Sequence, residues 1–246
     1  MSKILLNLLS FNFKASRKLM ELYNKKFDRK ILHDKSVLKL VKKKTDAPVV
    51  VDIGAYKGTY TDDILSCFPE SQVYCFEPIS HLSDALELKY KKNKKIKVFN
   101  VALGDENKKI DLCVNEYLPA TSILKPTENN TKAFPFIDTK TKNIKIDQKR
   151  LDDLASEYML MKPDLVKIDV QGYEKMVFQG GMKYLTQSEV IVTEVSFENV
   201  YENGVLVDEL SHLLVQMNYS LFGIYGWLYS RNGTPVQADF IFIKNS

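Results

Sequence analysis

Residues 49–61 read Val49-Val-Val-Asp52-Ile-Gly54-Ala-Tyr-Lys-Gly58-Thr-Tyr-Thr. A run of β-branched apolar residues favours a buried strand, and it leads into a turn with two glycines and then into a helix. Gly54 can adopt backbone angles that cost other residues energy, and it lets a ligand approach the main chain. Gly58 allows the helix to start tightly against the strand. The stretch predicts a strand–turn–helix unit of an α/β fold.

The same alternation continues along the chain. Because the short apolar runs show no polar face, they indicate strands of a parallel sheet that helices cover on both sides. Thr59 and Asp62 resemble a capping box at the start of the first of these helices. We expect strands at 49–53, 73–76, 97–102, 165–168 and 190–195, and helices at 60–67, 82–90, 174–184 and 205–217.

Two further strand candidates, 219–225 and 238–243, have no helix between them. Asn232-Gly233 lies in their connection and is typical of a hairpin turn. The sequence therefore predicts a doubly wound, mostly parallel seven-stranded sheet that ends in an antiparallel hairpin.

The segments outside this alternation define the domain organisation. Residues 1–46 are predicted to form an N-terminal helical extension, and residues 47–246 the main domain. Residues 109–148 are predicted to form an insertion, with strands at 109–114 and 143–147 around a polar, proline-containing loop and nothing of helical length. The helical periodicity of the extension rests on Leu19, Leu22, Tyr23, Phe27 and Ile31.

Composition narrows the class of protein. The chain has 246 residues and a net charge of +4, but residues 1–48 are strongly basic and the remainder is acidic. We interpret the basic arm as a solvated helix face; weak contact with an anionic membrane surface is the alternative. No aromatic residues interleave a basic strip, so no nucleic-acid partner is expected.

The three cysteines lack disulfide or zinc spacing, and no secretory signal or membrane span is evident, so we expect a cytoplasmic protein.

Asp52 helps to decide the class of ligand. Dinucleotide sites use G-x-G-x-x-G, because a pyrophosphate must lie against bare amides at a helix N-terminus. This chain has G-x-x-x-G, and the Asp52 carboxylate would repel a phosphate. S-adenosylmethionine carries a sulfonium and an ammonium and no phosphate, so it suits an acidic turn. The alternative is a βα turn that binds no ligand.

Further acids follow the next two predicted strands. Glu77, in Phe76-Glu77-Pro78, lies about 23 residues beyond Gly54, where a nucleotide-binding sheet places a carboxylate on the ribose hydroxyls. Asp105, after Ala102-Leu-Gly104, can accept a hydrogen bond from the adenine amine. An ordinary Gly-Asp turn explains Asp105 equally well.

A third acidic region lies at the ends of two later strands. Asp169 and Gln171 follow the strand at 165–168, and Glu194 ends the strand at 190–195. Since strand carboxyl ends line the ligand crevice of such sheets, Asp169 and Glu194 are candidates to bind an acceptor hydroxyl or to take its proton. The alternative is that either acid caps a helix. No histidine is assigned a role, and no metal site is predicted because Asp, Glu and His do not cluster at metal spacing.

Together these motifs resemble the FkbM family of methyltransferases and the broader class I methyltransferase fold, over about residues 49–243. The resemblance rests on the order and spacing of D-I-G-x-x-x-G at 52–58, F-E-P at 76–78, A-L-G-D at 102–105 and I-D-V-x-G-Y-E at 168–174.

The resemblance implies that S-adenosylmethionine is the methyl donor and that a hydroxyl is methylated, often on a sugar, a glycan or a polyketide-type metabolite. By position, Asp52 and Gly54 would hold the methionine end of the donor, Glu77 the ribose and Asp105 the adenine. The implied donor-binding set also contains Tyr56, Gly58, Pro78, Ala102, Gly104, Asp169 and Gln171.

One position departs from the family pattern. The family commonly has Glu where this chain has Gln171, which keeps a hydrogen-bonding group but carries no charge. The role of general base therefore falls to Asp169 or Glu194. The competing interpretations are a non-catalytic nucleoside-binding protein of the same fold and a nicotinamide-dependent oxidoreductase.

The acceptor is expected to bind near the insertion, around Leu118–Pro135, and near the last loops. Trp227 is expected in the hairpin connection, with Tyr225 and Tyr229, where aromatic faces can pack against a sugar. The alternative for these aromatic residues is that they cover the sheet edge or form a dimer contact.

Overall fold

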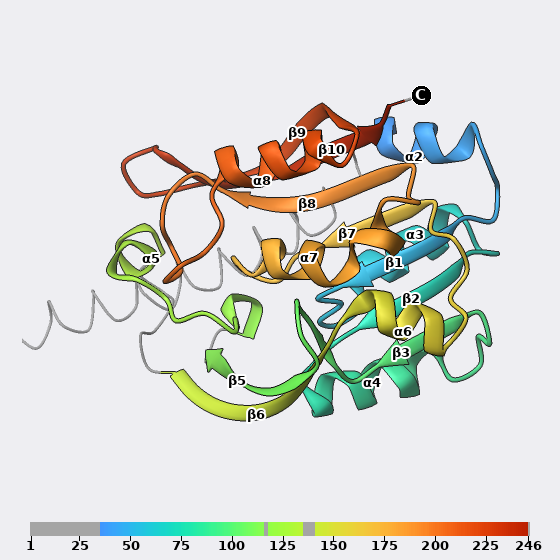
Figure 1. Ribbon diagram of the computed structural model, residues 1–246, viewed down its shortest axis with the longest axis horizontal. Helices are drawn as coiled ribbons and strands as arrows, with labels where there is room; N and C mark the ends of the chain where they lie inside the picture. Colours follow the sequence, from blue (N-terminus) through green and yellow to red (C-terminus); the bar gives the residue numbers. More distant parts are fainter. Residues whose placement is uncertain (1–34, 116–117, 135–140, 246) are drawn as a thin grey trace, which may run out of the picture.

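The computed structural model describes residues 35–115, 118–134 and 141–245 (Figure 1). Residues 35–42 of the predicted N-terminal extension form a helix, α2 (Lys35–Lys42). The remainder of that predicted extension, residues 1–34, lies outside the described residues. Among the described residues, no helix has the length and apolar character needed to cross a membrane.

A seven-stranded sheet forms the centre of the molecule, in the order β3-β2-β1-β7-β8-β10-β9. The first five strands in this order are parallel, and β10 runs antiparallel to both β8 and β9, which confirms the predicted sheet and hairpin. The strands are β1 (Val49–Ile53), β2 (Gln72–Phe76), β3 (Ile96–Phe99), β7 (Leu165–Ile168), β8 (Val190–Ser196), β9 (Tyr219–Tyr229) and β10 (Pro235–Lys244).

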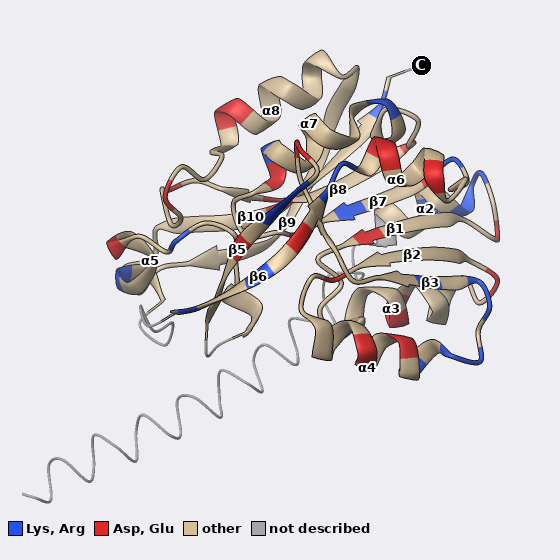
Figure 2. Cartoon of the chain, turned by 60° about the horizontal axis from the view of Figure 1, so that its bottom comes forward, with Lys and Arg blue, Asp and Glu red and all other residues tan. Residues whose placement is uncertain are grey.

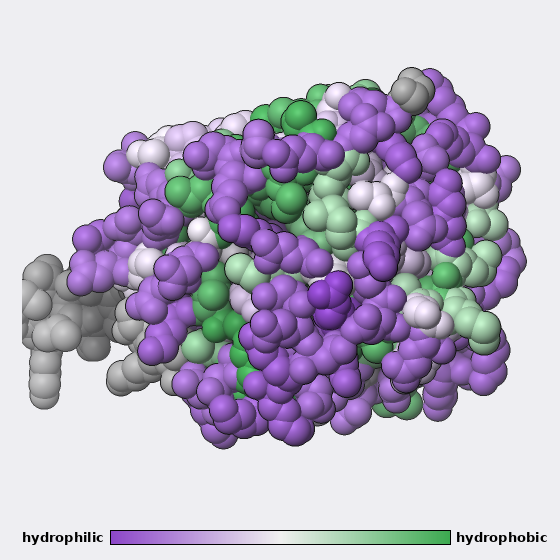
Figure 3. Space-filling view, viewed as in Figure 1, coloured by the Kyte–Doolittle hydropathy of each residue, from purple (hydrophilic) through white to green (hydrophobic). Residues whose placement is uncertain are grey.

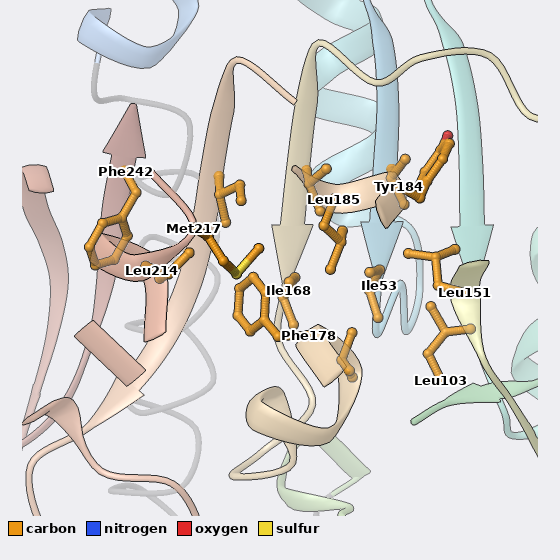
Figure 4. Packing of buried hydrophobic residues seen from close by; sticks show 14 of the residues in the cluster. Ile53, Leu103, Leu151, Ile168, Phe178, Tyr184, Leu185, Leu214, Met217 and Phe242 are labelled. Carbon is orange, nitrogen blue, oxygen red and sulfur yellow. The ribbon is translucent and has the colours of Figure 1, made fainter. Parts of the chain in front are cut away.

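Helices cover both faces of this sheet, as the two-sided apolar strands predicted. One face packs against α2, α3 (Thr59–Cys67) and α4 (Ser80–Tyr90), and the other against α6 (Leu151–Glu157), α7 (Glu174–Leu185) and α8 (Val207–Gln216). Figure 4 shows the second core, in which Ile53 and Ile168 of the central strands meet Phe178 and Leu185 of α7. On the outer surface over these helices, hydrophilic residues predominate and hydrophobic residues emerge mainly around α8 (Figure 3).

The insertion forms a second, three-stranded sheet in the order β4-β6-β5. It contains β4 (Ala102–Leu103), β5 (Lys108–Asn115) and β6 (Thr141–Lys149), a 3-10 turn (Leu118–Ala120), and α5 (Glu128–Ala133). Its apolar face packs on the start of α4 and on Tyr56, so the insertion lies beside the turn that follows β1. The short helix α5 was not predicted; the Thr127 side chain caps it by accepting a hydrogen bond from the Asn130 amide.

Three local predictions were wrong. The third strand of the main sheet ends at Phe99, and Ala102–Leu103 joins the second sheet. Helix α3 begins after Gly58 without a side-chain cap, because Asp62 instead pairs with Lys89 of α4. Trp227 lies within β9 rather than in the hairpin connection, since β9 extends to Tyr229.

Candidate active site

The turn after β1 is held by contacts within the protein. Gly54, Tyr56 and Gly58 all have positive φ angles, of 81°, 50° and 73°. A Cβ atom on Gly54 would lie 2.0 Å from the main-chain oxygen of Asp169, so the fold itself requires a glycine where β1 meets the end of β7. A Cβ atom on Gly58 would lie 2.5 Å from the Tyr90 hydroxyl, so this glycine lets α3 start against α4.

Asp52 is completely buried beneath this turn. One carboxyl oxygen accepts a hydrogen bond of 2.8 Å from the Thr61 hydroxyl of α3, and the other has no partner among the described residues. Burial raises the pKa of Asp52 above its ordinary value. In the sheet, Asp52 lies between Cys75 of β2 and Lys167 of β7. The unpartnered oxygen is a buried acceptor that favours a nearby cation or hydrogen-bond donor.

Glu77, at the end of β2, is 4% exposed and fixes the same turn. Its two carboxyl oxygens accept hydrogen bonds from the amides of Tyr56 (2.8 Å) and Ile79 (2.9 Å). Burial raises its pKa to about 7. The Asn100 side chain donates to the main-chain oxygens of Glu77 and Pro78, which joins the end of β3 to the end of β2. Because each carboxyl oxygen can accept a second hydrogen bond, Glu77 can still bind hydroxyl groups.

Asp105 is not at the end of β3, where it was predicted; it follows β4 in the second sheet. Gln148 of β6 connects it to α7: the Gln148 amide lies 3.5 Å from the Asp105 carboxyl, and the Tyr173 hydroxyl donates to Gln148. A Cβ atom on Gly180 would lie 1.8 Å from the Gly104 main-chain oxygen. The run from Ala102 to Asp105 therefore packs the second sheet against α7.

Gln171 brings the two predicted catalytic acids together. Its side-chain nitrogen donates hydrogen bonds of 2.8 Å to both Asp169 and Glu194. Its side-chain oxygen accepts from the Tyr201 hydroxyl, and its main-chain oxygen accepts from the Ser122 hydroxyl of the insertion, each at 2.7 Å. Gln171 thus links the ends of β7 and β8 to two loops that lie far away in the sequence.

The two acids have opposite electrostatic environments. Burial alone would raise the pKa of Asp169, but the charge of Lys167 and the hydrogen bonds from Lys167 and Gln171 lower it below its ordinary value. Burial, followed by the charges of Asp169, Glu174 and Asp239, raises the pKa of Glu194 well above its ordinary value. The arrangement therefore favours the ionised form of Asp169 and the protonated form of Glu194. Such separation is typical of acid–base sites.

The Asp169 side chain is 30% exposed, and Lys167 donates a hydrogen bond of 2.8 Å to it. Lys167 was not predicted as a site residue, although a lysine in the buried strand Leu165–Ile168 indicates one, because lysine is almost never buried unless it is paired. Gln237, which donates to Glu194 at 2.9 Å, and Tyr201 were not predicted either. No local pattern marks these last two residues.

Aromatic rings form a row on the α8 side of the sheet. Trp227 of β9 stacks on Phe197, which follows β8, with ring centroids 5.3 Å apart, and Tyr229 continues the row at 6.2 Å. Phe197 and Trp227 are partly buried against the core, whereas Tyr229 is 54% exposed.

The side chains at this edge suit a cationic ligand that has no phosphate. Carboxyl groups of Asp52, Glu77 and Asp169 lie at or near the strand ends, and Figure 2 shows an acidic position in β1 beside a basic position in β7. Of the nearby cations, Lys167 is bound to Asp169, and Lys57 lies 5.0 Å from the centre of the Tyr56 ring. This set fits the sulfonium and ammonium groups of S-adenosylmethionine and does not fit a pyrophosphate.

The chain is similar to a known protein family and to two known proteins. Residues 52–221 match the methyltransferase FkbM domain. The chain is 30% identical over 174 residues to the 2-O-methyltransferase NoeI of Sinorhizobium fredii, covering 68% of this chain and 71% of that protein. It is 26% identical over 155 residues to the methyltransferase sdnD of Sordaria araneosa, covering 54% and 60%. Among solved structures, magnesium protoporphyrin IX methyltransferase (ChlM) from Synechocystis, with bound SAM, covers 86% of this chain and 77% of its own, with a TM-score of 0.48 and 8% identity.

Proposed function

Because the chain belongs to the FkbM family of S-adenosylmethionine-dependent methyltransferases, we propose that it methylates a hydroxyl group of a sugar, a glycan or a related metabolite, with Asp169 as the proton acceptor. The observation that carries this proposal is the linked pair of carboxyls at the ends of β7 and β8. Asp169 is partly exposed and held ionised, and the Gln171 amide joins it to the protonated Glu194.

The donor side of the site is proposed to use the β1–β2 edge. Asp52 and Gly54 would lie at the methionine end, and Glu77 would bind the ribose hydroxyls through the free acceptor capacity of its oxygens. Asp105 is proposed for the adenine amine. Tyr56, Gly58, Pro78, Ala102 and Gly104 would complete the surface that contacts the donor.

When bound, S-adenosylmethionine supplies a methyl group already activated by its sulfonium. The protein must then hold the acceptor oxygen in line with that methyl, exclude water and receive one proton. Asp169 would accept the proton of the acceptor hydroxyl on a carboxylate oxygen as that hydroxyl is methylated. Glu194, being protonated, can donate a hydrogen bond to a neighbouring acceptor group.

Two observations support an acceptor of the sugar type. The name of the relative NoeI specifies O-methylation at a 2-position. The row formed by Phe197, Trp227 and Tyr229 presents aromatic rings near the end of β8, and such rings pack well against the C–H faces of sugars. A small-molecule or glycan acceptor and a cytoplasmic location complete the proposal; Cys67, Cys75 and Cys113 are free thiols.

The proposal is tested by transfer of tritiated methyl groups to a panel of methyl glycosides, in which each hydroxyl is blocked in turn. We expect O-methylated products from wild-type protein. Asp169→Asn should lower turnover by about 10²–10⁴-fold while leaving donor binding by calorimetry nearly unchanged. Asp111→Asn, a change in an exposed ion pair with Lys145, is the control. Transfer to nitrogen or carboxyl groups alone, or full turnover by Asp169→Asn, would contradict it.

Trp227→Ala separates the role of the aromatic row from that of the acids. If the row binds the acceptor, this change should raise KM for the acceptor while donor affinity stays the same. An unchanged acceptor KM would assign the row to packing at the edge of the sheet.

A further inference from the structure

Lys167 is an unusual residue for its position. It lies in β7, a central strand flanked by β1 and β8, and all four residues of this strand are buried. Lys167 itself is 6% exposed. Burying an ammonium group costs several kcal/mol unless its charge is compensated, so a lysine here requires acidic partners.

Four carboxyl groups on four strands lie on the same face of the sheet as Lys167. Asp52 is its register neighbour in β1, and Asp169 lies two residues after it, just beyond the end of β7. Glu194 of β8 and Asp239 of β10 are paired in register at the same edge. From the covering helix α3, the Tyr60 ring faces the ammonium group, with its centroid 5.8 Å from the lysine nitrogen.

These groups share one cation. Lys167 stabilises the ionised forms of all four carboxyl groups, whereas those groups destabilise one another. Its single direct ion pair is with Asp169, at 2.8 Å. In the part of the chain that the structure describes, no second lysine or arginine makes an ion pair with any of the four.

We propose that Lys167 is a positioning residue of the methyl transfer: its ammonium group, 2.8 Å from Asp169, holds that carboxylate in place and in the ionised form. This inference rests on the proposed function, in which Asp169 receives the hydroxyl proton. One lysine hydrogen and one Gln171 hydrogen occupy one lone pair on each Asp169 oxygen, which fixes the carboxylate but leaves acceptor capacity on both oxygens.

The consequence for chemistry concerns which acid loses its proton first. Without Lys167, four carboxyl groups would face one another across a buried surface with no cation among them, and protonation would be favoured at each. A protonated Asp169 cannot accept the hydroxyl proton. The lysine makes Asp169 a weaker base but keeps it in its basic form throughout the neutral range.

Lys167→Met, which removes the charge and keeps a similar length, tests this inference through the pH dependence of turnover. We expect the acidic limb of the kcat profile to move to higher pH, with turnover about tenfold or more lower at pH 7 and recovering toward wild type near pH 9. Donor affinity by calorimetry should stay within about threefold. Lys167→Arg retains the charge and should keep the acidic limb in place.

Lys175→Met is the matched control, because Lys175 forms its ion pair with Glu209 on the surface, away from the four carboxyls. A Lys167→Met protein that loses turnover equally at every pH, or loses none, would overturn the inference. Failure of wild-type protein to methylate any hydroxyl would instead overturn the proposed function.

A measurement on wild-type protein tests the inference even if Lys167→Met does not fold. Infrared difference spectra between wild type and Asp169→Asn report the charge of this single carboxyl. We expect Asp169 to stay ionised as the pH is lowered from 8 to about 6. A protonated Asp169 at neutral pH would refute the role of Lys167 whether or not an acceptor has been identified.

Discussion

Two acidic regions lie at the carboxyl edge of the sheet, one after β1 and β2 and one after β7 and β8. These regions, the β1–β2 end and the β7–β8 end, are built in different ways. At the β1–β2 end, the carboxyls of Asp52 and Glu77 accept hydrogen bonds from Thr61, Tyr56 and Ile79, each within 21 positions along the chain. These contacts are local, and two of the three donors are backbone amides.

At the β7–β8 end, Asp169 is held by Lys167 and Gln171, each two positions away, but Glu194 depends on side chains that are widely separated from it along the chain. Gln237 is 43 positions from Glu194, and Tyr201 is 30 positions from Gln171. Among the residues that the structure describes, only Lys167 supplies compensating positive charge there by a direct ion pair. The β1–β2 end therefore depends mainly on a local turn, whereas the β7–β8 end depends on assembly of the whole sheet.

The largest effect is expected where the two ends touch. Gly54→Ala would place a methyl group 2.0 Å from the Asp169 main-chain oxygen at a φ of 81°. We expect about 1–2 kcal/mol of left-handed strain and about 1–3 kcal/mol of steric overlap, measured as loss of unfolding free energy in urea. Gly233→Ala, with a similar φ of 82° and no atom within 4 Å, should show the strain alone. Equal losses in the two variants would mean that the contact between the two ends is unimportant.

The next effect is the pH dependence of stability. Burial raises the pKa of Glu77, Glu174 and Asp239 to about 7 in the folded protein, above their ordinary values. The folded state therefore binds more protons than the unfolded state between about pH 4 and 7, so unfolding free energy should rise as the pH falls through 7. Asp169, with its lowered pKa, acts oppositely: its contribution is present above about pH 4 and is lost on further acidification.

Urea midpoints between pH 8 and pH 3, taken in about half-unit steps, check this pattern. Glu77→Gln should reduce the change of unfolding free energy with pH near pH 7, because it removes the titrating carboxyl of the β1–β2 end. Asp239→Asn should do the same at the β7–β8 end. A protein that becomes less stable between pH 7 and pH 5 would contradict the assignment of the raised pKa values.

The same substitution should then give different results at the two ends. Glu77→Gln places an amide nitrogen against a backbone N–H of Tyr56 or Ile79, and we expect a loss of about 1–3 kcal/mol and weaker donor binding. Glu194→Gln replaces a protonated carboxyl with a neutral group whose oxygen can still accept from Gln171 and Gln237, so stability should change by less than about 0.5 kcal/mol. Calorimetric titration and urea unfolding of both variants provide the comparison, and similar losses would remove the distinction.

The smallest effect is expected from a single distant hydroxyl. Tyr201→Phe removes the hydrogen bond to the Gln171 side-chain oxygen and should cost about 1 kcal/mol, with a modest fall in turnover. Tyr158→Phe, on an exposed ring outside the proposed site, is the control and should change unfolding free energy by less than about 0.5 kcal/mol. A Tyr201→Phe protein as stable and active as the control would show that Gln171 needs no support from this loop.

The fold could be predicted well where structure depends on neighbouring residues. The strands at 49–53, 165–168 and 190–195 and the closing hairpin follow from runs of β-branched residues and turn signals. The errors occurred where a distant partner competed: Asp62 paired with Lys89 of α4 instead of capping α3, and Ala102–Leu103 paired with β6 instead of extending β3.

The residues at the carboxyl edge of the sheet could be predicted from the sequence. When strands and helices alternate, the strands are parallel, so all of them end at that edge. Asp52, Glu77, Asp169 and Glu194 could therefore be assigned to one region. The protonation states and hydrogen-bond partners of these four acids depend on the tertiary structure and could not be predicted from the sequence. The sheet order places β7 between β1 and β8, which sets Lys167 among acids from separate strands, and charges act through space without regard to their separation along the chain.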